Sequence, residues 1–157
     1  DATPGLKLRE TPLVTRAQLE ALREGREIAI VTGRPLSDAL DFLEREGLRD
    51  LFEVLVCMED APPKPAADPV VLACQKLGVQ SAWMIGDTPD DMRAARAACA
   101  TSAEASAQRE NHSLLAIACF GMLPPSTSDR EKASRALLLS GAGRIFSDWE
   151  SLLEKLA

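Results

Sequence analysis

AWMIGDTPDDMRAAR, at residues 82–96, decides how the chain is expected to fold. Its apolar start, residues 82–85, is typical of a buried strand, and it runs directly into Gly86 and Asp87. A helix is expected to follow, because Pro89 suits the first turn of a helix. The stretch therefore predicts a strand, a tight junction and a helix.

Three carboxylates, Asp87, Asp90 and Asp91, gather at this junction. A carboxylate just beyond a parallel strand points into the crevice where open α/β sheets bind ligands, and its oxygens suit Mg²⁺. The alternative is that the acids only complement the positive end of the helix dipole. Because Asp87 precedes the helix and follows a glycine, we favour a metal-binding role for it.

Helices and strands are expected to alternate along the chain. Apolar runs predict further strands at residues 27–32, 53–57, 114–120 and 144–146. Apolar periodicity and capping residues predict helices over 15–24, 35–47, 68–77, 129–139 and from Ser147 to the end. Capping boxes are expected at Thr15 with Gln18 and at Ser147 with Glu150, and the helix after Asp87 should reach Cys99. This alternation predicts an α/β fold with three layers, a doubly wound, Rossmann-like sheet. The first four strands in chain order, from 27–32 to the one that begins at residue 114, are expected to be parallel members of this one sheet.

Two other polar segments follow strands of this predicted sheet. Thr32 and Gly33 come after strand 27–32, and Lys64 lies in a proline-rich loop after strand 53–57. Parallel strands end at one edge of a sheet, so these residues should share a crevice with Asp87. A hydroxyl, backbone amides, an ammonium group and a metal-binding carboxylate together predict a phosphate site.

These motifs resemble those of a known family. VTGR, the lysine in PPKPAADP and GDTPDD resemble motifs II, III and IV of the haloacid dehalogenase (HAD) superfamily, most of whose members are Mg²⁺-dependent phosphatases. The resemblance implies that Thr32 binds the transferring phosphoryl group and that Lys64 stabilises it together with the nucleophile. It also implies that Asp87 ligates Mg²⁺ and that Asp91 is a ligand or supports the ligands.

One motif of the superfamily is absent. The first motif, Asp-x-Asp-x-Thr at the end of a central strand, supplies the nucleophile and the general acid/base, and no Asp-x-Asp occurs in these 157 residues. We therefore expect a HAD-like core over 13–157 that lacks its first strand. Residues 1–12 are interpreted as a linker or the remnant of a connection to a cap domain, and residues 100–113 as a polar insertion.

Two functions are compatible with this pattern. The first is a phosphohydrolase that acts on a small phosphorylated metabolite through an aspartyl-phosphate, its nucleophile lying outside these residues. The second is a catalytically inactive HAD-like domain that binds Mg²⁺ or a phosphorylated ligand. The sequence indicates neither the substrate nor the oligomeric state.

The composition of the chain indicates which partners are not expected and in which compartment the protein is expected. The chain has 18 basic and 24 acidic residues, a net charge of -6 and no basic cluster. Nucleic-acid binding is therefore not expected. No apolar run is long enough to span a bilayer. The four separated cysteines predict buried, reduced thiols and a cytoplasmic location. His112, the single histidine, lies in the polar insertion and is interpreted as a loop residue, and the sequon at 111–113 is discounted.

Overall fold

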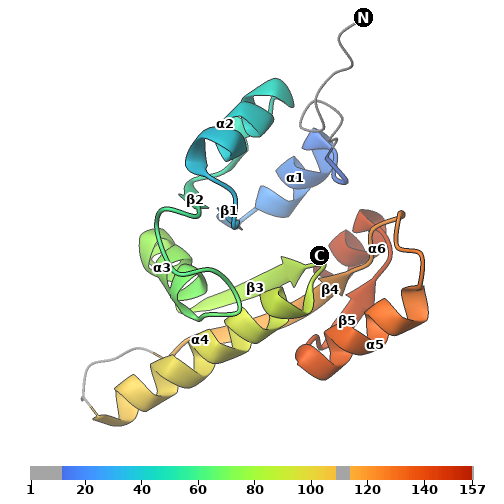
Figure 1. Cartoon of the computed structure of the whole chain (residues 1–157). Coiled ribbons are helices and arrows are strands. Elements are labelled where there is room, and N and C mark those ends of the chain that lie inside the picture. The colour runs from blue at the N-terminus through green and yellow to red at the C-terminus, as the bar shows by residue number, and fades with distance from the viewer. Residues whose placement is uncertain (1–11, 109–113, 157) are drawn as a thin grey trace, which may run out of the picture.

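The strands form two separate parallel sheets in this computed structural model, which describes residues 12–108 and 114–156 (Figure 1). One sheet pairs β1 (Ala29–Val31) with β2 (Val54–Val56), and the other has the order β3 (Ser81–Gly86), β4 (Ala116–Met122), β5 (Arg144–Phe146). All three strand pairings of the described residues are parallel, which was predicted for β1 with β2 and for β3 with β4. The prediction of one continuous sheet is wrong for the described residues, because no strand pairing joins β1 to β3.

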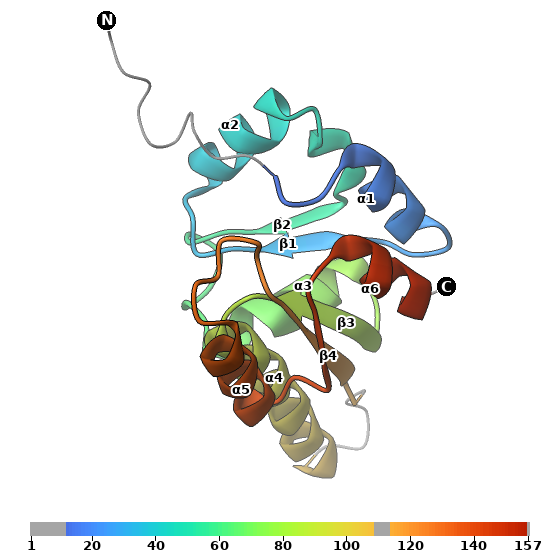
Figure 2. The same ribbon diagram turned by 90° about the vertical axis from the view of Figure 1, so that its right-hand side faces the viewer.

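One edge of each sheet faces the other sheet. Thr32 N donates to Val56 O at 2.9 Å, so the backbone groups of Val31, the preceding residue, point away from β2. Just before β3, Gln80 O accepts from Ala116 N at 2.9 Å, so the backbone groups of the next residue, Ser81, point away from β4. In both views β1 lies on the side of its sheet toward β3 (Figures 1 and 2). Within the described residues, neither edge has a strand partner.

The exposure of these strands agrees with an incomplete sheet. Every residue of β1 is only half-buried, no residue of β3 is buried, and Trp83 is 42% exposed. At the N-terminal ends of the strands, Arg26 crosses between the sheets: its guanidinium carbon lies 4.9 Å from the centroid of the Trp83 ring. The physical reason for the split is therefore that no described segment lies between β1 and β3.

The helices largely follow their sequence signals. They are α1 (Arg16–Arg23), α2 (Leu36–Arg45), α3 (Asp68–Leu77), α4 (Pro89–Gln108), α5 (Arg130–Ser140) and α6 (Trp149–Leu156), with a short 3₁₀ turn at Arg49–Leu51. Thr15 and Gln18 form the predicted capping box of α1. The predicted capping box of Ser147 and Glu150 is wrong, because Asp148 caps α6 by accepting from Ser151 N at 2.7 Å.

Helix α4 is longer than its sequence pattern indicated. It continues through residues 100–108, whereas we expected the helix to reach Cys99 and a polar insertion to follow. The alanines of this stretch have the highest helix propensity of all residues, which outweighs its lack of large apolar side chains. His112 and the sequon lie outside the described residues.

Helices cover both faces of the sheets, as the predicted three-layer fold requires. Apolar residues of α1, α2 and α6 pack with residues of both sheets in one core cluster, which includes Leu19, Leu43 and Leu152. Helices α3, α4 and α5 pack on the other face through smaller clusters. Among the described helices, none combines the length and the apolar character that a membrane span needs.

Three of the four cysteines are buried, as predicted. Cys57, Cys74 and Cys119 are buried, Cys99 is half-buried, and all are free thiols. Burial raises the pKa of the Cys57, Cys74 and Cys119 thiols, because a thiolate is poorly solvated there.

Candidate functional site

Lys64 connects the two sheets at the C-terminal ends of their strands. Its Nζ donates to Val31 O at 3.0 Å and to Asp91 Oδ1 at 2.5 Å. Val31 ends β1 and Asp91 lies in the first turn of α4, directly after β3. The ammonium group therefore lies at the end of the interval between β1 and β3, next to the junctions that carry Thr32 and Asp87.

Asp91 is buried and fully engaged by hydrogen-bond donors. It is 5% exposed, its Oδ1 accepts from Lys64, and its Oδ2 accepts from Thr88 N at 3.0 Å and Thr88 Oγ1 at 2.8 Å. A buried carboxylate is stable only when it is paired and hydrogen-bonded in this way. In this geometry Asp91 orients Lys64, and the prediction that it supports a metal remains untested.

Gly86 allows Asp91 to reach this position. A Cβ added to Gly86 would lie 2.5 Å from both Cβ and Oδ2 of Asp91. We expect Gly86→Ala to displace Asp91 and lower the free energy of unfolding by about 1–3 kcal/mol, as overpacking of a core does. Urea denaturation followed by circular dichroism measures this. In the matched control, Gly143→Ala, the nearest atom lies 3.6 Å from the added Cβ, and an equal loss in both variants would contradict the role given to Gly86.

Thr32 and Gly33 form an open turn at the end of β1. Thr32 Oγ1 accepts from Arg34 N at 3.2 Å, so the hydroxyl hydrogen is available to donate to a ligand. A Cβ on Gly33 would meet no atom within 4 Å, so the backbone here is accessible. Both features suit contacts to phosphate oxygens.

Glu59 supports this turn and was not singled out from the sequence. Its carboxylate oxygens accept from Leu36 N at 3.0 and 3.1 Å, at the start of α2. Met58 N donates to Arg34 O at 2.9 Å, which ties the loop after β2 to the turn after β1. No sequence signal pairs these segments, because their proximity depends on the pairing of β1 with β2.

Asp87 is the exposed carboxylate of the site. The described part of the chain brings together no group of three or more His, Cys, Asp or Glu side chains that could hold a metal. Mg²⁺, however, is commonly held by one or two carboxylates with water and substrate phosphate oxygens. Asp87 fits that kind of site, whereas both oxygens of Asp91 already accept hydrogen bonds.

The sequence of the chain is similar to those of known proteins. The profile of the haloacid dehalogenase-like hydrolase family matches residues 10–105. An imidazoleglycerol-phosphate dehydratase of Phytophthora nicotianae is 44% identical over 104 residues, which cover 64% of this chain and 23% of that protein. A phosphoglycolate phosphatase of Chromobacterium violaceum is 39% identical over 80 residues, 48% of this chain and 36% of that protein. The chain thus spans well under half of the length of either relative.

Solved structures share the fold. A haloacid dehalogenase-like hydrolase from Streptococcus pneumoniae superposes with a TM-score of 0.64 at 21% identity, over 90% of this chain and 57% of that one. A HAD-superfamily hydrolase from Geobacter sulfurreducens gives a TM-score of 0.63 at 16% identity, over 90% and 54%. The family match covers the strands and loops that carry Thr32, Lys64 and Asp87. This chain belongs to the haloacid dehalogenase-like hydrolases.

Proposed function

We propose that this chain is the core of a Mg²⁺-dependent phosphohydrolase that cleaves small phosphate monoesters through an aspartyl-phosphate. The observation that carries the proposal is the position of Lys64, held by Val31 O and Asp91 where the strands of both sheets end. An ammonium group fixed there can neutralise both a phosphate and an attacking carboxylate. The phosphatase relative and the family match support the same reaction class.

The remaining residues have complementary roles in this proposal. The Thr32 hydroxyl and the Gly33 amide donate to the oxygens of the transferring phosphoryl group. Asp87 holds Mg²⁺, which when bound supplies positive charge that offsets the charge developing on the phosphate. Asp91 and Glu59 keep Lys64 and the Thr32 turn in place.

The nucleophile is assigned to a strand between β1 and β3. Such a strand would pair with the two edges that have no partner among the described residues, and its end would lie beside Lys64. A carboxylate oxygen there attacks phosphorus, the ester oxygen leaves with a proton from a neighbouring acid, and an acyl phosphate forms. Water then cleaves the acyl phosphate to inorganic phosphate and regenerates the carboxylate.

A second candidate is a HAD-like domain that binds Mg²⁺ or a phosphorylated ligand without turnover. The pairing of Lys64 with Asp91 is compatible with it, because this ion pair forms within the described residues without a nucleophile. The four free thiols support a reducing, cytoplasmic location for either function.

Metal binding can be tested apart from turnover. Millimolar Mg²⁺ is expected to raise the Tm of the chain, because an ion that binds only the native state stabilises that state. Each kcal/mol added to the free energy of unfolding should raise the Tm by about 2–4 °C. Asp87→Asn should abolish this rise in a thermal denaturation experiment. Asp90→Asn is the matched control, since Asp90 lies in the same turn but pairs with Arg93 at 3.0 Å. An unchanged Mg²⁺ response in Asp87→Asn would remove Asp87 from the metal site.

A further inference from the structure

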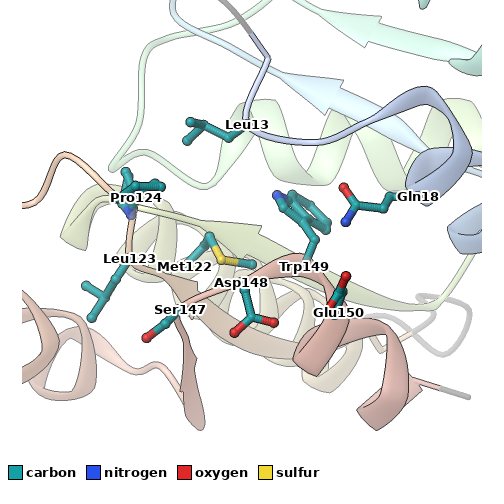
Figure 3. Close-up of a pocket in the computed structure, with 10 residues that line it drawn as sticks. Leu13, Gln18, Met122, Leu123, Pro124, Ser147, Asp148, Trp149 and Glu150 are labelled. Atoms are coloured by element: carbon teal, nitrogen blue, oxygen red, sulfur yellow. The ribbon is translucent and has the colours of Figure 1, made fainter.

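A cavity of about 340 Å³ lies at the C-terminal ends of β4 and β5, beside the candidate site (Figure 3). Gly86 of β3 is in register with Gly121 of β4, so the next residues, Asp87 and Met122, are neighbours across the sheet. Met122 lines the cavity and is itself in register with Phe146, the last residue of β5. Since adjacent strands are about 4.8 Å apart, the cavity wall begins about one strand spacing from Asp87.

The cavity is lined mainly by apolar residues. Its size falls in the range of sites for small organic molecules. Trp149 lines it, and the indole Nε1 is buried without a hydrogen-bond partner among the described residues. Figure 3 shows this nitrogen on the side of the ring toward Leu13. The apolar lining consists of Leu13, Met122, Leu123, Pro124 and Pro125.

The rim of the cavity is acidic. Asp148 and Glu150 line it, and no Lys or Arg is among its described lining residues. Hydrogen bonds from the backbone N–H and then the hydroxyl of Ser151 lower the pKa of Asp148, so this carboxylate stays ionised at neutral pH. A ligand group that enters the cavity therefore meets negative charge that no lining cation offsets.

We infer that this cavity receives the organic group of the phosphate ester and that its acidic rim selects a neutral or cationic group over a carboxylate. The inference rests on the proposed function, because Asp87 and Lys64 must hold the phosphate for its ester group to reach Met122. The family match ends at residue 105, before β4, so the cavity lies mostly outside the segment that defines the family. The substrate in the name of the phosphatase relative, which ends in a carboxylate, is therefore not expected to be preferred here.

Three esters of similar size test this selectivity. They are 2-phosphoglycolate, 2-hydroxyethyl phosphate and phosphoethanolamine, which end in a carboxylate, a hydroxyl and an ammonium group. Isothermal titration of the chain with each ester in the presence of Mg²⁺ measures Kd without requiring turnover. We expect 2-phosphoglycolate to bind at least about tenfold more weakly than phosphoethanolamine, because like charges repel at close range.

Variants of the rim residues test whether their charge, rather than the shape of the cavity, determines which ester binds more tightly. In the double variant Asp148→Asn and Glu150→Gln, the difference between the two esters should fall to about threefold or less. Asparagine also caps helices, so α6 is expected to remain folded. Glu154→Gln is the matched control, because Glu154 is exposed on α6 but does not line the cavity.

Two outcomes would overturn the inference alone: equal binding of 2-phosphoglycolate and phosphoethanolamine by the unaltered chain, or an unchanged preference in the double variant. If none of the esters binds and inorganic phosphate does not bind either, the proposed function fails and this inference fails with it.

Discussion

Lys64→Met is expected to lower phosphatase turnover of the complete enzyme by about two to three orders of magnitude, the usual effect of losing one electrostatic stabiliser. The variant should also be less stable by about 3–5 kcal/mol, because it leaves the carboxylate of Asp91 buried without its partner. The Asp91 side chain is 7% exposed and that of Lys64 is 19% exposed, so solvent cannot replace the lost ion pair. Steady-state kinetics and urea denaturation measure the two effects.

Lys76→Met provides the matched control for this experiment. Lys76 lies on α3 and is 3.9 Å from Asp60, and both side chains are more than 30% exposed. Exposed pairs of this kind contribute little to stability, at most about 1 kcal/mol. If Lys76→Met and Lys64→Met reduced turnover equally, Lys64 would have no specific role in the site.

The 157-residue chain is expected to show no Mg²⁺-dependent turnover of phosphate monoesters above the background rate. Thr32, Lys64 and Asp87 can bind and polarise a phosphate, but binding without a positioned nucleophile does not lower the chemical barrier. A longer chain that includes an Asp-x-Asp strand should show turnover in the usual range of about 1–1,000 per second. A phosphate-release assay on both chains measures the difference.

The two outcomes of this comparison have different consequences. Turnover by the 157-residue chain that Asp87→Ala abolishes would mean that a residue within it acts as the nucleophile. Absence of turnover in the longer chain, with the Mg²⁺ response of Asp87 intact, would favour the binding domain over the enzyme.

Local sequence signals predicted most of the individual elements. The Gly86-Asp87 junction follows a strand as expected, because an apolar run with flanking glycines has few alternatives. The capping box of Thr15 and Gln18 appears in the structure because both of its hydrogen bonds lie within one helical turn. The sequence also predicted that the residues after the strands share one edge of the sheet, because parallel strands end at the same edge. The structure agrees for Lys64, which lies beside the end of β1.

Features that depend on distant segments could not be predicted. Strand patterns carry no information about which edges lack a partner, and the gap between β1 and β3 instead corresponds to the missing central strand that the family resemblance implied. The acceptors of Lys64 are Val31 O and Asp91, which lie 33 and 27 residues from it in the sequence. The cavity beside Asp87 was also missed, because its walls come from Leu13, α1 and the segments that follow β4 and β5.

The open edges of β1 and β3 also bear on how this chain behaves in concentrated solution. A strand edge with unpaired N–H and C=O groups is a template for a strand of another molecule, and natural proteins protect such edges against aggregation. The edge of β3 spans residues 81–86 and carries the exposed Trp83, which adds apolar surface to the template. A strand that paired with both β1 and β3 would therefore also protect the chain against aggregation, because it would cover both open edges.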